Sequence, residues 1–440
     1  MRLVDLDYYV FPRIVNAGKI GNIAIYPRAR HASFPEGTKI KIHITPMEHT
    51  LERPDGEPAV YPWAEAVFKD GAIRFRYFFE SEQEYRLSFT RDWNNGMNTR
   101  HGEYTLSVYA VGGDLYAMRP YRGDLHVHTD QSDGRECPET VVANYRSYGY
   151  DFMALTDHHR MYPSQEAIDY YKKIPTGICL FTGEEVHTPG THVHIVNFGG
   201  TQSVNQWADA NPEEYEKQIR DMEARLPQLD AGVDRMQYAA CRVIFDKIRA
   251  CGGLGIFAHP HWIAHAYHVR DDMTWQLFKD CPFDAFELLG GQSCMENNMQ
   301  TLIYAQARAQ GMRFPVVGSS DSHCSSNTSI YPDRSVLEES TIVLSPDCEK
   351  ESILASIRNF RSVAVEQYAG EATPRVYGEY RLAKYVIFLL REVFPQHDEL
   401  CAIEGGLMRL AVGGDESAAG LLAQFKDKAG AYMRRCFSGA

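Results

Sequence analysis

Histidines and carboxylates gather in one part of this sequence, at spacings that suit metal binding. Of the 17 histidines, twelve lie between His126 and His323. Side chains alternate between the two faces of a strand, so His126 and His128 share one face of a predicted strand. Asp133, just past that strand, adds a carboxylate oxygen. Imidazole is the commonest side-chain metal ligand, so this edge is predicted to bind metal, with an ordinary surface strand as the alternative.

Further clusters of the same residue types follow, each at or next to the end of a predicted buried strand. They are Thr156-Asp-His-His159, Glu184-Glu185, His192 with His194, His259-Pro-His261, and Gly318-Ser-Ser-Asp-Ser-His323. In α/β barrels, the C-terminal ends of the strands converge on one active site. Clusters that are far apart in the sequence are therefore predicted to meet in space.

The elements that position these clusters alternate between strand and helix. Apolar runs such as Phe152–Thr156, Leu254–Ala258 and Pro315–Gly318 alternate with helical patterns such as Val233–Cys251. Repeated βα units imply a parallel sheet, and this many of them fit a closed α/β barrel better than an open sheet. The acidic stretch 201–230 is predicted to be a helical excursion, either a solvated insertion or part of a lid.

Two further regions flank the barrel, which is assigned to residues 119–370. Residues 1–118 hold alternating runs such as Ala72–Phe79 between turn residues, which predicts a small all-β sandwich of immunoglobulin or fibronectin type. We expect a structural or dimerising role for it, and hence a homo-oligomer, rather than a ligand-binding role. Apolar residues at helical spacing over 371–440 predict a helical C-terminal appendage.

The composition is that of an ordinary globular protein. The 45 basic and 58 acidic residues give a net charge of −13, which disfavours long nucleic acid as a partner. We expect no membrane association, because the start lacks the features of a secretory signal and no apolar run reaches roughly 18 residues. The ten cysteines are scattered without a CxxC pair, which suits reduced thiols in the cytoplasm.

The motifs follow one another in a distinctive order. They are His-x-His, Asp in Ser-Asp-Gly, Thr-Asp-His, Gly-x-Glu, His before an apolar strand, Ala-His-Pro, and Gly-Ser-x-Asp-x-His. Over roughly residues 122–366, this series resembles the polymerase-and-histidinol-phosphatase (PHP) family of metal-dependent phosphoesterases. The resemblance implies a distorted seven-stranded (β/α) barrel with a trinuclear site for divalent zinc, manganese or iron. One departure is the extra residue before the aspartate of the last motif.

Carried over by position, the resemblance implies nine metal ligands. The first metal would take His126, His128, Glu185 and Asp321, the second Glu185 as a bridge with His194 and His259, and the third Asp133, His158 and His323. Glu184 competes with Glu185, which is preferred because it stands two residues after Gly183. His192 competes with His194, which directly precedes an apolar run.

Three other residues are candidates for roles in catalysis. Arg160 is predicted to bind a substrate phosphate, with an ordinary ion pair as the alternative. His159 is expected to orient a ligand. His261 is expected either to donate to a substrate oxygen or to be a structural histidine. We expect the remaining histidines of this region on the surface or in a lid: His187, His265 and His268.

Together these features predict a metal-dependent phosphoesterase that hydrolyses a small phosphate ester, a monoester ahead of a diester. Clustered cations would acidify a bridging water, and the resulting hydroxide would attack phosphorus. A nucleotide or a sugar phosphate would suit such a site. One alternative is an amidohydrolase-like C–N hydrolase, which the set Asp133, His158 and His323 disfavours. Another is a non-catalytic, metal-bearing barrel that acts through its β-sandwich.

Overall fold

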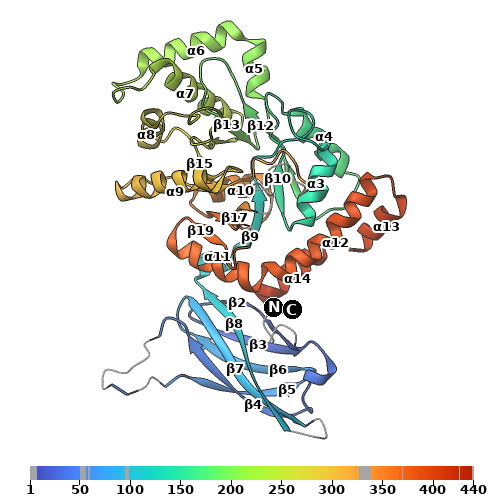
Figure 1. Cartoon of the computed structure of the whole chain (residues 1–440). Coiled ribbons are helices and arrows are strands. Elements are labelled where there is room, and N and C mark those ends of the chain that lie inside the picture. The colour runs from blue at the N-terminus through green and yellow to red at the C-terminus, as the bar shows by residue number, and fades with distance from the viewer. Residues whose placement is uncertain are drawn as a thin grey trace. The chain divides into compact units, whose positions relative to one another are not determined.

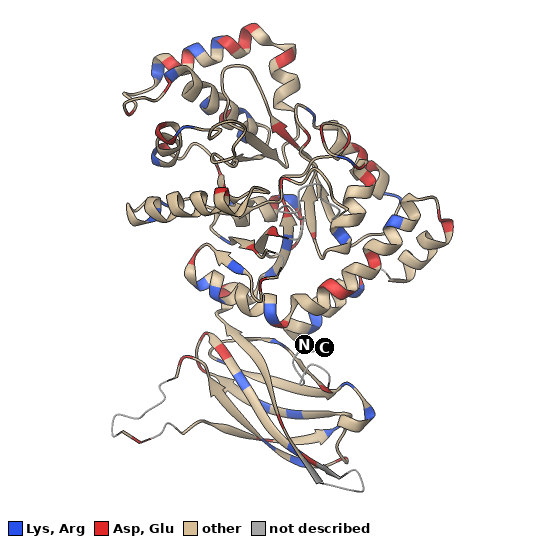
Figure 2. Ribbon diagram, viewed as in Figure 1, with Lys and Arg blue, Asp and Glu red and all other residues tan. Residues whose placement is uncertain are grey.

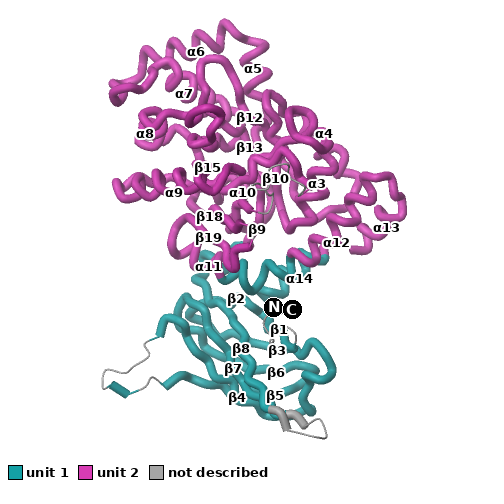
Figure 3. Tube along the Cα trace, viewed as in Figure 1, with its two compact units in different colours: residues 1–118, 388–397, 428–440 teal, residues 119–387, 398–427 magenta. Residues whose placement is uncertain are grey.

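The computed structural model describes residues 7–49, 56–57, 60–94, 99–326, 338–368, 370–425 and 427–438. The chain divides into two compact units, coloured separately in Figure 3. Unit 1 comprises residues 1–118, 388–397 and 428–440, and unit 2 comprises residues 119–387 and 398–427. The residues that the sequence grouped into one C-terminal appendage are thus shared between the two units.

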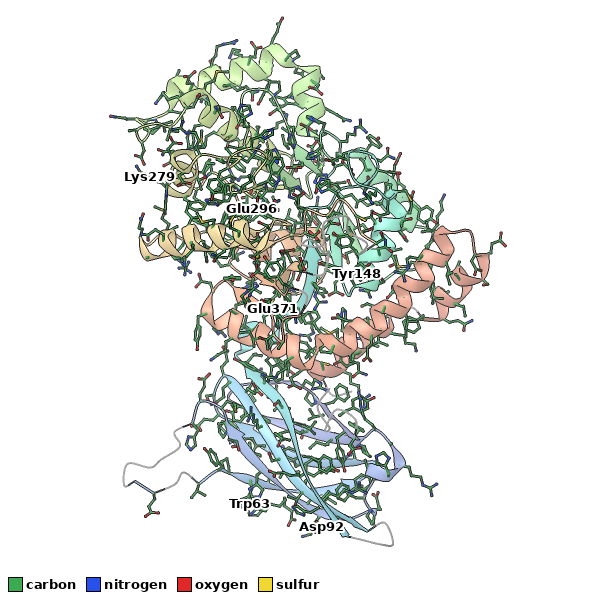
Figure 4. The ribbon with its side chains drawn as sticks, viewed as in Figure 1. Trp63, Asp92, Tyr148, Lys279, Glu296 and Glu371 are labelled. Carbon is green, nitrogen blue, oxygen red and sulfur yellow. The ribbon has the colours of Figure 1, made fainter. Side chains whose placement is uncertain are left out.

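Unit 1 is built on one eight-stranded sheet with the order β1-β3-β6-β5-β4-β7-β8-β2. Its strands are β1 (Tyr8–Phe11), β2 (Ile14–Asn16), β3 (Lys19–Pro27), β4 (Lys39–Pro46), β5 (Trp63–Lys69), β6 (Ala72–Phe79), β7 (Gln83–Asn94) and β8 (Thr99–Val111). Neighbouring strands pair antiparallel, except that β2 pairs parallel with β8. Trp63 and Asp92, labelled in Figure 4, belong to β5 and β7 of this sheet.

The sheet of unit 1 rolls up rather than forming the two separate sheets of the predicted sandwich. Only Pro12 and Arg13 separate β1 from β2, yet these strands stand at opposite ends of the strand order. Strand β4 pairs with both β5 and β7, which makes the hydrogen-bonded sheet continuous. The alternation in β4 buries every second residue, and the inward side chains form one apolar core that includes Ile42 and Leu87.

Unit 1 also contains short helical segments and the end of the chain. These are the 3-10 turn Arg30–Ala32, α2 (Gly113–Tyr116) and α14 (Lys428–Ser438). Helix α14 contacts β1 and β2, and the backbone N–H of Arg13 donates to the carbonyl of Cys436 at 2.7 Å. The strand-rich part and the end of the chain are therefore bonded to each other within this unit.

Unit 2 contains two sheets of mixed direction (Figure 1). The first has the order β11-β10-β9-β17-β18-β19 and is made of β9 (Arg119–Asp124), β10 (Phe152–Ala154), β11 (Cys179–Phe181), β17 (Glu339–Ser345), β18 (Ser362–Glu366) and β19 (Arg375–Tyr377). The second has the order β12-β13-β14-β15-β16 and is made of β12 (Gly183–Val186), β13 (Ile195–Phe198), β14 (Leu254–Phe257), β15 (Ala285–Leu289) and β16 (Val316–Gly318).

The segments that follow β10 and β9, two neighbouring strands inside the first sheet, pair with the two edges of the second sheet. An isolated parallel bridge joins His158 to Glu185, and another joins Val127 to Ser322. The pairing is parallel within β9–β10–β11 and within β14–β15–β16, but β17 and β13 run antiparallel to their neighbours. The predicted α/β class is confirmed. The predicted parallel sheet is wrong in part, because β13 and β17 run antiparallel to their neighbours. The seven-stranded barrel stays a prediction.

The described part of unit 2 also contains helices, several of which pack against strands of the two sheets. They are α3 (Pro138–Ser147), α4 (Tyr162–Tyr171), α5 (Val204–Ala210), α6 (Pro212–Arg225), α7 (Arg235–Ala250), α8 (Asp271–Asp280), α9 (Cys294–Ala309), α10 (Lys350–Arg358), α11 (Tyr380–Glu392), α12 (Phe394–Val412) and α13 (Glu416–Phe425), of which α11 and α12 extend into both units. Aromatic side chains fill the core between α7, α8 and the second sheet, among them Phe257, Phe278 and Phe286. None of the described helices combines the length and the apolar character that a membrane crossing requires.

The stretch 201–230 forms α5 and α6 and lies against α7. Tyr215 and Ile219 of α6 are buried in a cluster with Val243 of α7. The opposite face of α6 carries exposed ion pairs, such as Lys217 with Asp221 at 2.7 Å, and Figure 2 shows both signs of charge along this helix. These features are those of an amphipathic helix with one solvated face.

Candidate metal centre

Glu185 lies at the middle of the imidazole cluster. Alternation along β12 turns Glu185 toward the cluster and Glu184 away from it. Oε2 of Glu185 lies near His158 Nδ1 at 2.8 Å, His126 Nε2 at 3.3 Å and His128 Nε2 at 3.5 Å. Oε1 lies near His194 Nδ1 at 2.7 Å, His187 Nε2 at 3.5 Å and His259 Nε2 at 3.7 Å. One buried carboxylate thus divides six imidazoles into two sets.

Two aspartates hold the other edges of the cluster. Asp321 Oδ1 lies 3.0 Å from His128 Nε2. Asp133 Oδ2 lies 3.3 Å from His323 Nε2 and 3.4 Å from His158 Nε2.

The structure brings all nine predicted ligands together. Eight of them fall into groups whose ligand atoms lie within 4.8 Å of one another: His126, His128 and Asp321; His126, Glu185 and His259; and His128, Asp133, His158 and His323. His194 joins through its contact with Glu185.

The backbone that carries these ligands is tied across strand ends. The predicted strand at 125–127 lies beyond the end of β9, where Leu125 and Val127 are buried in apolar cores and the two histidines take the other side. The N–H of His128 donates to the Ser322 carbonyl at 2.9 Å, which fixes it beside Asp321. His159, His259 and Asp321 have positive φ angles of 61°, 21° and 45°. Positive φ is uncommon outside glycine, although His and Asp adopt it more often than most residue types.

The geometry separates the two competing pairs of candidates. Glu184 accepts hydrogen bonds from Asn197, Ser203, Asn205 and the backbone of Val204 at the start of α5, so this carboxylate is satisfied away from the cluster. His192 is exposed, and its carbonyl accepts a hydrogen bond from His268 Nε2. Glu185 and His194 are the members of each pair that face the other ligands.

Arg160 and His159 lie beside the centre. Together with Ser132, His158 and His187 they line a hollow of about 360 Å³. The Arg160 guanidinium donates to the Gln131 carbonyl, and the backbone N–H of His159 donates to the Glu185 carbonyl at 3.2 Å.

His261 has its contacts elsewhere. Its Nε2 lies 3.8 Å from Asp271 Oδ1, and its ring faces Tyr267. The loop that holds it is anchored by Glu296 of α9, labelled in Figure 4, whose Oε1 accepts from the N–H of Ile263 at 2.8 Å. Among the described residues, the contacts that join the ligands do not include His261, and its buried Nδ1 has no hydrogen-bond partner. Its role as a donor to substrate or as a structural histidine stays a prediction.

Four residues of the site were missed by the sequence analysis. Glu287 Oε2 lies 3.0 Å from His126 Nδ1, and Gln292 Nε2 donates to Asp321 Oδ2 at 3.1 Å. Such partners orient metal ligands. His187 and His268, which were expected on the surface or in a lid, are partly exposed and lie against the ligands: His187 reaches Glu185, and the His268 ring centroid lies 4.1 Å from that of His194. A lone glutamate inside the apolar run of β15 was the one signal available, for Glu287.

Protons are unevenly shared within the cluster. Burial opposes the charge on Glu185, but His194 and His126 hold the pKa of its carboxyl well below the usual range. Burial also disfavours charge on His158, yet Asp133 and Glu185 raise its pKa to about 10. At His194 burial prevails and lowers the pKa to about 3. Metal ligands must be deprotonated, so a cation that binds here must displace protons.

Buried polar atoms at the centre support a fit to cations. Within the described part of the chain, His126 Nε2, His128 Nε2, His194 Nδ1 and both carboxylate oxygens of Glu185 are buried without a hydrogen-bond partner. Buried polar groups are normally paired, and each exception calls for an explanation. Imidazole nitrogen mixed with carboxylate oxygen is the donor set that zinc, manganese and iron accept. The residues present therefore fit divalent metal.

The solved structures that are similar to part of this chain include those of three other proteins. They are a two-domain protein containing a predicted PHP-like metal-dependent phosphoesterase from Bacteroides vulgatus (16% identity, TM-score 0.38, 56% of this chain and 65% of that one), a protein described as a metal-dependent phosphoesterase from Bifidobacterium adolescentis (18%, 0.33, 46% and 87%), and an amidohydrolase from Chromobacterium violaceum with bound sulfate (18%, 0.31, 48% and 89%). The chain spans less than two thirds of the first of these.

The family model gives a more specific result. No curated protein matches the chain. Residues 124–226, however, match the model of the PHP domain, and six of the nine predicted ligands lie within that range: His126, His128, Asp133, His158, Glu185 and His194. The resemblance drawn from the motifs is therefore confirmed over residues 124–226, which carry a PHP domain.

Proposed function

We propose that this chain is a metal-dependent phosphoesterase that hydrolyses a small phosphate ester, a monoester ahead of a diester. The observation that carries the proposal is the convergence of nine imidazole and carboxylate side chains, with Glu185 at the middle of the cluster. The proposed ligands of three divalent ions are His126, His128, Asp133, His158, Glu185, His194, His259, Asp321 and His323.

The side chains of the chain itself have distinct tasks in this proposal. Divalent cations supply Lewis-acid polarisation of phosphoryl oxygens and acidify water when they are bound. Glu185 holds two sets of imidazoles through its two oxygens, which fixes the spacing between cations. Glu287 and Gln292 orient His126 and Asp321 from behind, because each occupies the atom of its partner that does not face the cluster centre.

The hollow beside the centre favours a small substrate. Its volume of about 360 Å³ lies at the lower end of the range for small-molecule sites. Arg160 lines this hollow, and a guanidinium can bind a phosphate through two parallel hydrogen bonds. His159 lines it too, which suits a contact to the substrate rather than to a metal. We assign no catalytic role to His261, whose contacts are with Asp271 and Tyr267.

The test is phosphate release from a panel of monoesters and diesters by zinc-loaded and manganese-loaded protein. We expect selective release that is lost in Asp321→Asn, because that carboxylate lies within 4.0 Å of three of the imidazoles. The matched control is Asp169→Asn on α4, an exposed carboxylate paired with Lys172.

Absence of release from protein shown to carry metal would contradict the proposal. Activity of such protein on C–N bonds would then favour an amidohydrolase-like enzyme. Inactivity on both bond types would favour a non-catalytic, metal-bearing domain.

A further inference from the structure

His187 stands on the same edge as Glu185, at the end of β12. The two residues are separated by one position, so alternation directs both side chains to the same face. The N–H of His187 donates to Asn205 Oδ1 at 2.9 Å, and Asn205 Nδ2 donates to the Glu185 carbonyl at 3.1 Å. Asn205 is buried in α5, so the helical excursion holds both residues in place.

The imidazole of His187 reaches the atom of Glu185 that two predicted ligands share. Its Nε2 lies 3.5 Å from Oε1, between the distances of 2.7 Å for His194 Nδ1 and 3.7 Å for His259 Nε2. The rings of His187 and His194 lie 4.3 Å apart between centroids. His187 is therefore as close to Oε1 as the two imidazoles that the PHP resemblance assigns to the second metal.

The local spacing matches a metal coordination shell. The group that contains His187 and whose ligand atoms all lie within 4.8 Å of one another consists of His158, Glu185 and His187. His194 and His259 are linked to His187 through the shared atom Glu185 Oε1. Ligands about 2.1 Å from one tetrahedral zinc ion are roughly 3.4 Å from each other. The 3.5 Å separation of His187 Nε2 and Glu185 Oε1 agrees with that spacing.

A second arrangement uses the same atoms differently. His158 Nδ1 lies 2.9 Å from His187 Nε2, which is also the distance of an ordinary hydrogen bond. In that arrangement His187 would only orient His158, whose Nε2 faces Asp133 in the third group. The two arrangements predict effects on different metals, so an experiment can separate them.

We propose that His187 is a tenth ligand of the centre, completing with Glu185 Oε1, His194 and His259 the shell of one divalent cation. Three imidazoles and one carboxylate fill the four positions that zinc prefers, and closed four-ligand sites are typical of structural zinc. This cation is then held permanently, and the other two keep the open positions for substrate. The inference rests on the proposed function only in that the centre holds metal.

The test measures zinc affinity by competition with a chromophoric chelator, together with visible absorption of the cobalt-loaded protein. His187→Ala should lower the affinity for one zinc equivalent by at least about tenfold and change the cobalt absorption, because one nitrogen ligand is lost. His265→Ala, which removes an exposed histidine, should leave both unchanged. His187→Gln, which keeps side-chain bulk, serves if the alanine variant does not fold, and His187→Asp should restore part of the affinity.

The decisive comparison repeats His187→Ala in protein that carries His323→Ala, which breaks the third group. We expect the loss of zinc affinity caused by His187→Ala to persist in this background, because the proposal places His187 at the second metal and not in the group that contains His323. If the loss disappears, or if His187→Ala binds zinc as the wild type does, the inference is overturned. If the wild-type protein binds no metal at all, the proposed function fails instead, so the two failures are distinguishable.

Discussion

The core of unit 1 and the metal centre of unit 2 are both buried, but they differ in whether their buried polar atoms have hydrogen-bond partners. In unit 1, the buried hydroxyl of Tyr8 donates to the Ala32 carbonyl at 2.9 Å, and that of Tyr85 donates to the Ser81 carbonyl at 3.1 Å. At the centre, both oxygens of Glu185 and several imidazole nitrogens have no hydrogen-bond partner within the described residues. These two hydroxyls of the rolled sheet are paired within the chain, whereas the atoms without a partner at the centre gather on one carboxylate and the imidazoles around it, where a ligand from outside the chain would pair them.

The largest effects are expected at Glu185 and its neighbour Glu184. These carboxylates are adjacent in the sequence, but Glu185 faces the imidazole cluster and Glu184 accepts hydrogen bonds away from it. Glu185→Gln should abolish phosphate release and reduce the bound metal, because it removes the charge that two sets of imidazoles share. Glu184→Gln should keep the metal but lower the free energy of unfolding by about 1–3 kcal/mol, because it weakens four hydrogen bonds at the start of α5.

Metal analysis and urea denaturation of both variants check this pair. Retention of metal by Glu185→Gln, together with its loss from Glu184→Gln, would reverse the roles assigned to the two carboxylates.

A substitution in the core of unit 1 should lower stability and leave the bound metal unchanged. Ile42 is fully buried there, so Ile42→Ala should lower the free energy of unfolding by about 2–5 kcal/mol through lost burial and the cavity left behind. Metal content per folded chain should not change. A drop in metal content at temperatures where the variant is folded would show that the centre depends on the unit 1 core.

The ligands were predictable because they are encoded locally. His126 and His128 alternate with buried Leu125 and Val127, and Asp321 and His323 follow an apolar strand. Their partners were not, because Glu287 and Gln292 reach the ligands from the second sheet, and strand alternation does not say which strands lie side by side. The same limit explains the unit 1 sheet, where strands such as β6 were predicted from the sequence but β2 and its pairing with β8 were not.

Glu339 is a buried acid outside the metal centre, and the effect expected from it is smaller than those above. Burial, and then Glu338 and Glu366, raise the pKa of Glu339 well above its ordinary value of 4.5. When the pKa of an acid is higher in the folded protein than in the unfolded chain, its contribution to stability is complete below the unfolded value, here 4.5. That contribution is lost as pH rises from there through the folded-state pKa.

Chemical denaturation at a series of pH values measures this effect. The unfolding free energy of the wild type should fall as pH rises above 4.5, by at most about 1.4 kcal/mol per pH unit from this group. Glu339→Gln cannot ionise and should flatten that part of the profile. An unchanged slope in the variant would show that Glu339 does not supply this dependence.

The most direct test of the metal centre is the number of divalent ions bound per chain, measured by elemental analysis after reconstitution with zinc or manganese. The nine converging side chains predict three ions in the wild type and fewer in Asp321→Asn. Binding of no ion by folded wild-type protein, or equal metal content in the variant, would contradict the account.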